Sequence, residues 1–254
     1  MSDSVRVPLQ QGLSRELIKY IAMLTMLLNH IAGIFLPSGT WLCELLTDVG
    51  YFTAVTMLYF LVEGYQYTHS RPRYLLRLFG FALLSQLPYC LAFTEEGILA
   101  PCTLNMLFTL CLCFLLIAGL DRFRHPAARV ALAAAAILLS CLCDWAVLAP
   151  VFTLLFLWAG HDRRRVRIAF ALDALLFAAM TFLGGLGRFS LGVNLLYALL
   201  GALGIALAGV CIGGFYYGRR MKVGTTFSKW FCYLFYPIHL LILGLLRIAL
   251  NMPF

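Results

Sequence analysis

The sequence contains few charged residues. Only 12% of its 254 residues are Asp, Glu, Lys or Arg, whereas 63% are hydrophobic and the mean hydropathy is +0.91. A soluble domain of this length cannot bury so much apolar surface, so the scarcity of charge excludes the soluble classes. Residues 1–16 also lack an apolar signal-peptide core. We therefore expect an integral membrane protein with a cytoplasmic segment at 1–16, followed by a first span that acts as a signal anchor.

The apolar residues fall into nine segments, separated by short polar or Gly- and Pro-containing breaks. About 20 helical residues cross the roughly 30 Å hydrocarbon core of a bilayer. We predict an all-α polytopic bundle of about nine transmembrane helices in one domain, residues 17–254. The segments are 17–36, 41–65, 74–94, 102–120, 127–144, 146–160, 168–186, 190–215 and 230–251. Cys143-Asp144-Trp145 interrupts the fifth and sixth, so a hairpin that does not cross fully is the alternative there.

The basic residues predict the orientation. All 19 Lys and Arg residues except Arg188 and Arg247 fall on one side of this arrangement, and the longest loop on the other side carries Glu95 and Glu96. By the positive-inside rule the N-terminus is cytoplasmic and the C-terminus lies outside. The same rule accounts for the net charge of +8, so no nucleic-acid partner is expected. The basic side also suits an anionic soluble ligand.

The nine cysteines lack the spacing of a metal site. Cys111/Cys113 and Cys141/Cys143 are each two residues apart, so their side chains point about 200° apart around a helix and cannot share a metal. We expect no metal and mostly small apolar packing. Cys43, Cys90 and Cys102 fall near outer helix ends, where an oxidising compartment could bridge two of them.

Asn29 and His30 lie well inside the first apolar segment. His30 is about 20 Å along the helix from Leu17, past the bilayer midplane. A titratable ring at that depth is costly unless it faces protein or water, so it is a candidate functional residue. The structural alternative is a histidine that ties two helices together through hydrogen bonds.

The stretch from Tyr59 to Pro88 places a carboxylate, aromatic rings and guanidinium groups at one inner mouth. Arginine forks suit phosphate, and tyrosine rings stack on a base, so a nucleotide-containing cofactor fits here. Ordinary residues of the membrane interface are the alternative. The candidate cofactor-binding residues are Glu63, Tyr67, His69, Arg71, Arg73 and Arg77.

The last apolar segment contains Tyr236-Pro237-Ile238-His239. His239 falls near the midplane, at a depth similar to that of His30, and Pro237 frees a backbone carbonyl one turn earlier. Asn105, Asp144, Asp173 and Asn194 are further intramembrane polar residues, for which structural hydrogen bonding is the alternative. We assign Asn105, Asp144 and Tyr236 to acceptor binding.

Five stretches together resemble the TraX family, and the resemblance covers nearly the whole chain. They are IKYIAMLTMLLNHIAG near the N-terminus, LVEGYQYTHSRPRYLLRLFGFALLSQLP, LNMLFTL at 104–110, the Cys143-Asp144-Trp145 break, and YLFYPIHLLIL near the end. The resemblance implies a membrane acyltransferase of a bacterial cytoplasmic membrane, like the pilin N-acetylase for which the family is named. It also implies distant similarity to the acyltransferase-3 and heparan-glucosaminide acetyltransferase enzymes, which use cytosolic acetyl-CoA and an intramembrane histidine.

Carried over by position, His30 matches the first-helix histidine of the family and His239 the YPxHL histidine, while Glu63 and Arg71 to Arg77 match the EGxxxT…YLxRL stretch. Two positions depart from the family pattern. Asn29 stands where the family usually has Asp, and Val49-Gly50-Tyr51-Phe52 replaces a Gly-Arg element. Loss of the carboxylate removes a partner that would make the histidine more basic.

These residues predict acyl transfer from acetyl-CoA or another acyl-CoA to a small amine, sugar or peptide acceptor. Neutral His30 would act as general base, with Asn29 orienting the ring or stabilising the oxyanion and His239 as the third catalytic candidate. A covalent acetyl-histidine relay is a variant. The competing class is a non-enzymatic transporter or assembly partner, although the halves show no self-similarity.

Overall fold

The computed structural model describes residues 12–94, 102–218 and 225–250. Within these ranges the chain forms nine α-helices, one π-helix and no β-strand. The elements are α1 (Arg15–Phe35), α2 (Trp41–Tyr67), α3 (Arg71–Phe93), α4 (Met106–Arg122), α5 (Pro126–Ser140), α6 (Leu148–Ala159), α7 (Arg163–Gly185), α8 (Leu191–Val210), η1 (Cys211–Phe215) and α9 (Thr225–Ala249). Each predicted segment is helical. Arg6, Glu95, Glu96, Arg219, Arg220 and Lys222, used for the orientation, lie outside the described residues.

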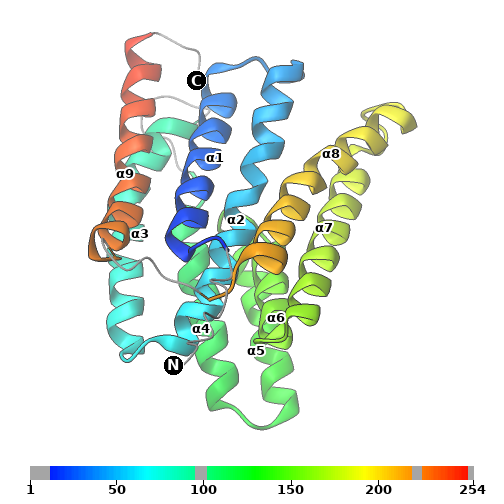
Figure 1. Ribbon diagram of the computed structural model, residues 1–254. Helices are drawn as coiled ribbons and strands as arrows, with labels where there is room; N and C mark the ends of the chain where they lie inside the picture. Colours follow the sequence, from blue (N-terminus) through cyan, green and yellow to red (C-terminus); the bar gives the residue numbers. More distant parts are fainter. Residues whose placement is uncertain (1–11, 95–101, 219–224, 251–254) are drawn as a thin grey trace, which may run out of the picture.

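Among the described residues, six helices are long and apolar enough to cross a membrane: α1, α2, α3, α7, α8 continued by η1, and α9. The chain is therefore a multi-pass membrane protein. The predicted count of nine crossings is not confirmed. Helices α5 and α6 have 15 and 12 residues, so they are about 22 and 18 Å long, short of the roughly 30 Å hydrocarbon core. Both stop well below the upper ends of α2 and α8 in Figure 1, as the hairpin alternative requires.

The helix starts follow from local sequence signals. The Ser14 hydroxyl accepts a hydrogen bond from the Leu17 amide at 3.2 Å and caps α1. The Asp162 carboxylate caps α7 by accepting from the Arg164 amide at 2.8 Å. Pro126 occupies the first turn of α5, where its missing N–H costs nothing. These residues explain where along the sequence α1, α5 and α7 begin.

Helix α2 is the centre of the bundle. It has buried residues along its whole length and packs against α1, α4, α6 and α8. Helices α3 and α1 both pack against α9, so α1 to α4 and α9 form one group, while α7 and α8 form a hairpin beside it (Figure 1). The candidate site lies within the first group.

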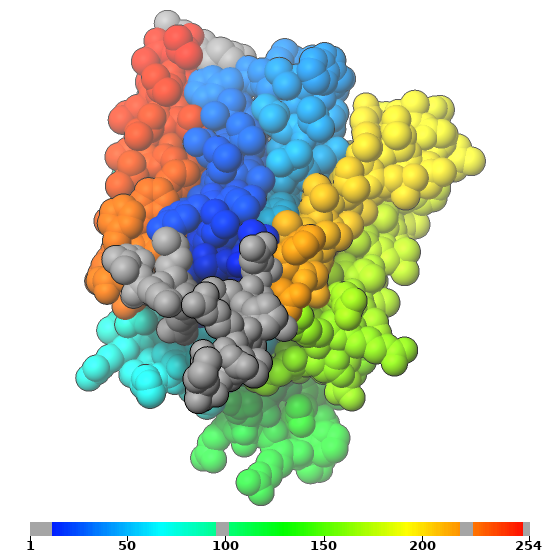
Figure 2. Space-filling view, viewed as in Figure 1, coloured from blue at the N-terminus to red at the C-terminus, as the bar shows by residue number. Residues whose placement is uncertain are grey.

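The α7–α8 hairpin is attached where α8 crosses α2. Gly204 faces the backbone of Asp48 and Phe52 so closely that a Cβ atom would collide with it. Beyond this crossing the helices diverge and leave a groove of about 410 Å³ lined by Trp41, Leu45 and neighbouring residues. Figure 2 shows the notch between the upper ends of α2 and α8.

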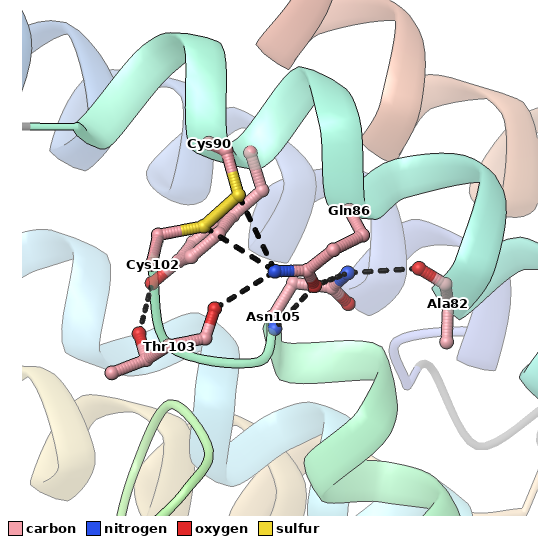
Figure 3. Close-up of a disulfide and its surroundings, with 7 residues drawn as sticks. Ala82, Gln86, Cys90, Cys102, Thr103 and Asn105 are labelled. Atoms are coloured by element: carbon pink, nitrogen blue, oxygen red, sulfur yellow. Dashed lines mark hydrogen bonds between the residues drawn. A yellow bond between two sulfur atoms is a disulfide. The ribbon is translucent and has the colours of Figure 1, made fainter. Parts of the chain in front are cut away.

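The two ends of the bundle differ chemically. At one end, here called the basic end, Arg71 pairs with Asp121 at 3.3 Å and Tyr67 contacts His161. The first contact links the start of α3 to the end of α4, and the second links the end of α2 to the α6–α7 turn. At the other, here called the far end, a disulfide links Cys90 and Cys102, whose Cα atoms are 5.7 Å apart (Figure 3).

Cys90 and Cys102 are thus two of the three cysteines expected near outer helix ends. The third, Cys43, is free and donates to the Ala32 carbonyl at 3.7 Å. The general expectation of packing roles is correct for Cys111 and Cys113, which are buried free thiols.

Candidate functional site

His30 of α1 and His239 of α9 meet inside the bundle. The Nδ1 atom of His30 lies 2.8 Å from Nε2 of His239, and the two rings are nearly parallel, with centroids 5.0 Å apart. The Nδ1 atom of His239 lies 2.7 Å from the carbonyl oxygen of Phe235. The structure therefore joins the two histidines, which are 209 residues apart in the chain, into one hydrogen-bonded pair.

The Phe235 carbonyl defines the tautomers of both rings. A carbonyl oxygen only accepts, so Nδ1 of His239 carries a proton. In a neutral pair Nε2 of His239 then accepts, and Nδ1 of His30 is the donor. Nε2 of His30 keeps its lone pair, and among the described residues it has no hydrogen-bond partner. His30 is thereby arranged as a base, with His239 positioned behind it.

A cavity of about 730 Å³ leads from the basic end to His30. Its walls come from α1, α2, α3, α4 and α9, together with Asp144 and Trp145 of the α5–α6 turn. Arg15 and His30 both line it and lie about 22 Å apart along α1. Between these ends it is lined by apolar and sulfur-containing side chains such as Met23 and Met26. The cavity joins a charged mouth to the histidine pair.

The cations that line the mouth come from three helices. They are Arg15 and Lys19 of α1, Arg77 of α3 and Lys229 of α9. Among the predicted cofactor-binding arginines, only Arg77 is in this set. Arg71 pairs with Asp121 and lies over the Tyr65 ring at 4.2 Å, with its side chain half exposed. Arg73 is exposed and, like Arg71, is not among the residues that line the cavity.

Glu63 belongs to a polar cluster behind the mouth. Its Oε2 lies 3.3 Å from Nε of Arg15, and its Oε1 accepts a 2.7 Å hydrogen bond from the Tyr216 hydroxyl. Arg15 also donates to the Phe60 carbonyl at 3.1 Å. Burial raises the pKa of Tyr216, and the Glu63 charge adds to the shift, so the phenol stays protonated and donates. Glu63 does not line the cavity, and its contacts hold α1, α2 and the end of η1 together.

Tyr67 and His69 lie at the rim of the mouth and line the cavity. The Tyr67 side chain is exposed and its ring lies 5.7 Å from that of His161, in the α6–α7 turn. His69 is also exposed. These two side chains are placed where a ligand entering from the basic end would pass.

The deep end of the cavity is lined by Asn29, His30, Asp144 and Tyr236. The Asn29 amide nitrogen donates to the Thr47 carbonyl at 3.0 Å. Oδ1 of Asp144 accepts a hydrogen bond from the Trp145 amide at 2.9 Å. Three predicted catalytic or acceptor residues therefore line the same cavity as His30.

Asn105 does not join this group. It is fully buried and does not line the cavity. Its Oδ1 caps α4 by accepting from the Leu107 amide, and its Nδ2 donates to Gln86 and to the Ala82 carbonyl. These contacts are those of the structural alternative, and acceptor binding by Asn105 stays a prediction.

Comparisons with known proteins identify the family of this chain. The family model described as TraX protein matches residues 14–247. This chain belongs to the TraX family. It is also 31% identical over 234 residues to a Dichelobacter nodosus protein named "Probable fimbrial assembly protein FimC, serogroup H1", covering 89% of this chain and 92% of that protein. No solved structure matches the chain.

Within this TraX-family chain, Asn29 lines the cavity and also packs against α2. Gly50 of α2 faces it, and a Cβ at position 50 would collide with the Asn29 side chain. Gly50 is part of the Val49 to Phe52 stretch that departs from the family pattern. The close approach explains why a glycine is needed there.

Sequence reasoning missed Arg15, Lys19 and Lys229 as cavity residues. The missed signal is helical spacing: Arg15 and Lys19 are four residues apart, so they share one face of α1 with Met23 and Met26, which also line the cavity. Lys229 lies on α9, and no local pattern connects it with α1.

Asp173 and Asn194 lie away from the cavity. Asn194 donates to the Phe182 carbonyl at 2.8 Å and ties α8 to α7. Asp173 of α7 is fully buried, and neither of its carboxylate oxygens has a hydrogen-bond partner in the described part of the chain.

Proposed function

We propose that this TraX-family protein transfers an acetyl or other acyl group from cytosolic acyl-CoA to an amine or hydroxyl acceptor. The observation that carries the proposal is a single cavity that joins a cationic mouth to an imidazole nitrogen with a free lone pair. Phosphates need cations, and acyl transfer to an amine or hydroxyl needs a base. The cavity supplies both at opposite ends.

The donor would bind with its phosphates at the mouth. Arg77 of α3 and Lys229 of α9 line the cavity there on two neighbouring helices, and Lys19 lies one turn further in than Arg15. Tyr67 and Tyr74 add rings on which a base can stack. The pantetheine arm would then follow the apolar middle section, and the thioester would lie beside His30. Acyl-CoA is the only cofactor invoked, and the lipid bilayer surrounds the complex.

The chemical step uses Nε2 of His30. The acceptor's nitrogen or oxygen attacks the thioester carbonyl carbon while Nε2 takes its proton. The tetrahedral intermediate collapses with cleavage of the C–S bond, and the departing CoA sulfur takes that proton back from His30. His239 holds His30 in the tautomer that this requires. We assign the second N–H of the Asn29 amide to the oxyanion.

The acceptor would lie between His30 and the α5–α6 turn. Asp144 supplies a carboxylate oxygen there, and Tyr236 supplies a phenol. A carboxylate accepts hydrogen bonds from an amine or a hydroxyl, and its charge favours the amine. A peptide amine of a pilus subunit fits the family name and the relative's name, and we include it by analogy only.

The proposed orientation places the basic end in the cytoplasm of a bacterial cell. The described basic residues Arg15, Arg71, Arg122 and Arg163 support it by the positive-inside rule. The disulfide at the far end supports it independently, because disulfides persist in oxidising compartments. The N-terminus would then be inside the cell and the C-terminus outside.

Protection of Cys232 tests donor binding in the purified protein. This free thiol lines the cavity near Lys19. We expect CoA to slow its alkylation by N-ethylmaleimide at least about fivefold, with dephospho-CoA less effective, because bound ligand blocks access by mass action. Cys141, which is free and exposed on the α5–α6 turn, is the internal control and should react equally with or without CoA.

Turnover tests the reaction itself. Radiolabelled acetyl-CoA and a panel of amines, amino sugars and peptides should yield acylated product. If CoA protects Cys232 but no product forms, CoA binding is supported and the transferase proposal is contradicted. If CoA does not protect Cys232 and no product forms, the transporter or assembly role is favoured instead.

A further inference from the structure

The Cys90–Cys102 disulfide lies next to the hydrogen bonds that hold the deep end of the cavity. Gln86 of α3 donates to the Thr103 carbonyl at 2.9 Å and approaches both sulfur atoms, at 3.5 and 3.3 Å. Its Oε1 accepts from the backbone amide of Asn105 at 3.1 Å and from its side chain at 2.8 Å. Figure 3 shows these groups around the disulfide. The segment 102–105 is therefore fixed to α3 by one covalent bond and several hydrogen bonds.

The same segment holds the α5–α6 turn. The Leu104 amide donates to the Leu142 carbonyl at 3.0 Å, and the Leu104 carbonyl accepts from the Asp144 amide at 2.8 Å. One turn into α4, the Thr109 hydroxyl donates to the Asp144 carbonyl at 2.6 Å. The backbone of Asp144 is thus attached on both sides to chain that the disulfide anchors.

The turn needs this support because its backbone is strained. Trp145 and Val147 have φ values of 58° and 64°, in the left-handed region that non-glycine residues rarely adopt and that is especially costly for a β-branched valine. A strained turn persists when its surroundings over-determine it. Leu104 and Thr109 supply that restraint from outside the hairpin.

We propose that the Cys90–Cys102 disulfide positions Asp144 for acceptor binding, by fixing residues 102–105 against the α5–α6 turn. The acceptor part of this inference rests on the proposed function, whereas the structural part does not. Formation of the disulfide removes two protons and two electrons from the two thiols. The far end must therefore meet an oxidant that acts by disulfide exchange, such as an oxidised protein dithiol of the outer compartment.

Cys143 is a built-in reporter of the turn. It is a free thiol, 8% exposed, directly before Asp144. In the oxidised full-length protein we expect N-ethylmaleimide to label Cys143 far more slowly than the exposed Cys141. Reduction with a phosphine, or the double variant Cys90→Ser/Cys102→Ser, should speed Cys143 labelling about tenfold, because a loosened segment opens more often. Peptide mass spectrometry resolves each site.

Two variants make the result specific. Gln86→Leu keeps the disulfide but removes the hydrogen bonds to residues 103 and 105, so it should also speed Cys143 labelling. Cys211→Ser, in η1 and outside the network, should leave the Cys143 rate unchanged. If the double variant does not fold, phosphine reduction of the folded wild type gives the same comparison. Cys143 protection that survives both reduction and Gln86→Leu overturns the proposal.

Kinetics then test the link to Asp144. Reduction should raise the KM for the acceptor about tenfold and leave the KM for acyl-CoA within about twofold, a split that a general loss of folded protein would not produce. Equal changes in both constants would refute positioning of the acceptor site. If the wild type shows no turnover, the proposed function fails while the Cys143 measurement still decides the structural part.

Discussion

The two ends of the cavity differ in the side chains that line them. The mouth presents Lys19, Arg77 and Lys229 on long side chains, whereas the deep end presents short or ring side chains held by hydrogen bonds. Charges near water are screened and adapt to a ligand, so they contribute mainly to affinity. Groups fixed in a dry interior act through exact placement, and their loss affects the chemical step. The difference predicts large effects on turnover at the deep end and moderate effects on KM at the mouth.

The largest effect should come from His30. His30→Ala removes the nitrogen with the free lone pair, and we expect turnover to fall about 10²- to 10⁴-fold with little change in the KM for acyl-CoA. Steady-state kinetics of the purified protein measure both constants. His125→Ala is the matched control, because His125 is exposed at the N-terminus of α5 and lies outside the cavity lining. Near-normal turnover of His30→Ala would exclude the general-base role.

A smaller loss is expected for His239, which does not line the cavity and acts through His30. His239→Phe removes the acceptor for the His30 Nδ1 proton and should lower turnover about 10- to 100-fold. His239→Gln, whose amide oxygen can accept that proton's hydrogen bond, should recover part of the activity. The pH profile of turnover should also move in His239→Phe, since the base has lost its partner. A mere packing role predicts equal loss in both variants and an unmoved profile.

The mouth should give the smallest effects. Arg77→Ala is expected to raise the KM for acyl-CoA about tenfold and to leave kcat nearly unchanged, and the effect should shrink in high salt. Arg73→Ala, an arginine of the same helix that does not line the cavity, should change the KM less than about twofold. Equal effects of the two substitutions would mean that the phosphates bind outside the cavity mouth, where the sequence pattern alone had placed them.

The outcome for the arginines shows how far sequence reasoning reached. The spacing of Arg71, Arg73 and Arg77 predicted one cationic mouth, but Arg71 lies about 120° around α3 from Arg77. Arg73 shares a side of the helix with Arg77 but lies one turn nearer the start of α3, outside the cavity lining. Arg71 instead pairs with Asp121, a contact between α3 and α4. The sequence shows on which helix a residue lies. Whether that residue faces the cavity depends on how the helix packs against its neighbours.

Glu63 and Asn105 teach the same lesson for polar residues. Both were expected to bind ligands, and both are engaged by other parts of the protein: Glu63 by Arg15 and Tyr216, and Asn105 by Gln86. A buried polar group must find partners, and the sequence does not show whether the partner is a ligand or another helix. Long-range contacts decide this.

The sequence by itself determined the membrane class, the nine helical segments and the depth of His30, because hydrophobicity and the 1.5 Å rise per residue are local properties. It also placed His239 at a similar depth. The tertiary structure alone decided that the two rings share a hydrogen bond, that Phe235 defines their tautomers, and that the cavity opens onto Arg77 rather than Arg73. These features depend on the packing of α1 against α9 and of α3 against α4 and α9. Such contacts join residues far apart in the chain, and no local sequence pattern encodes them.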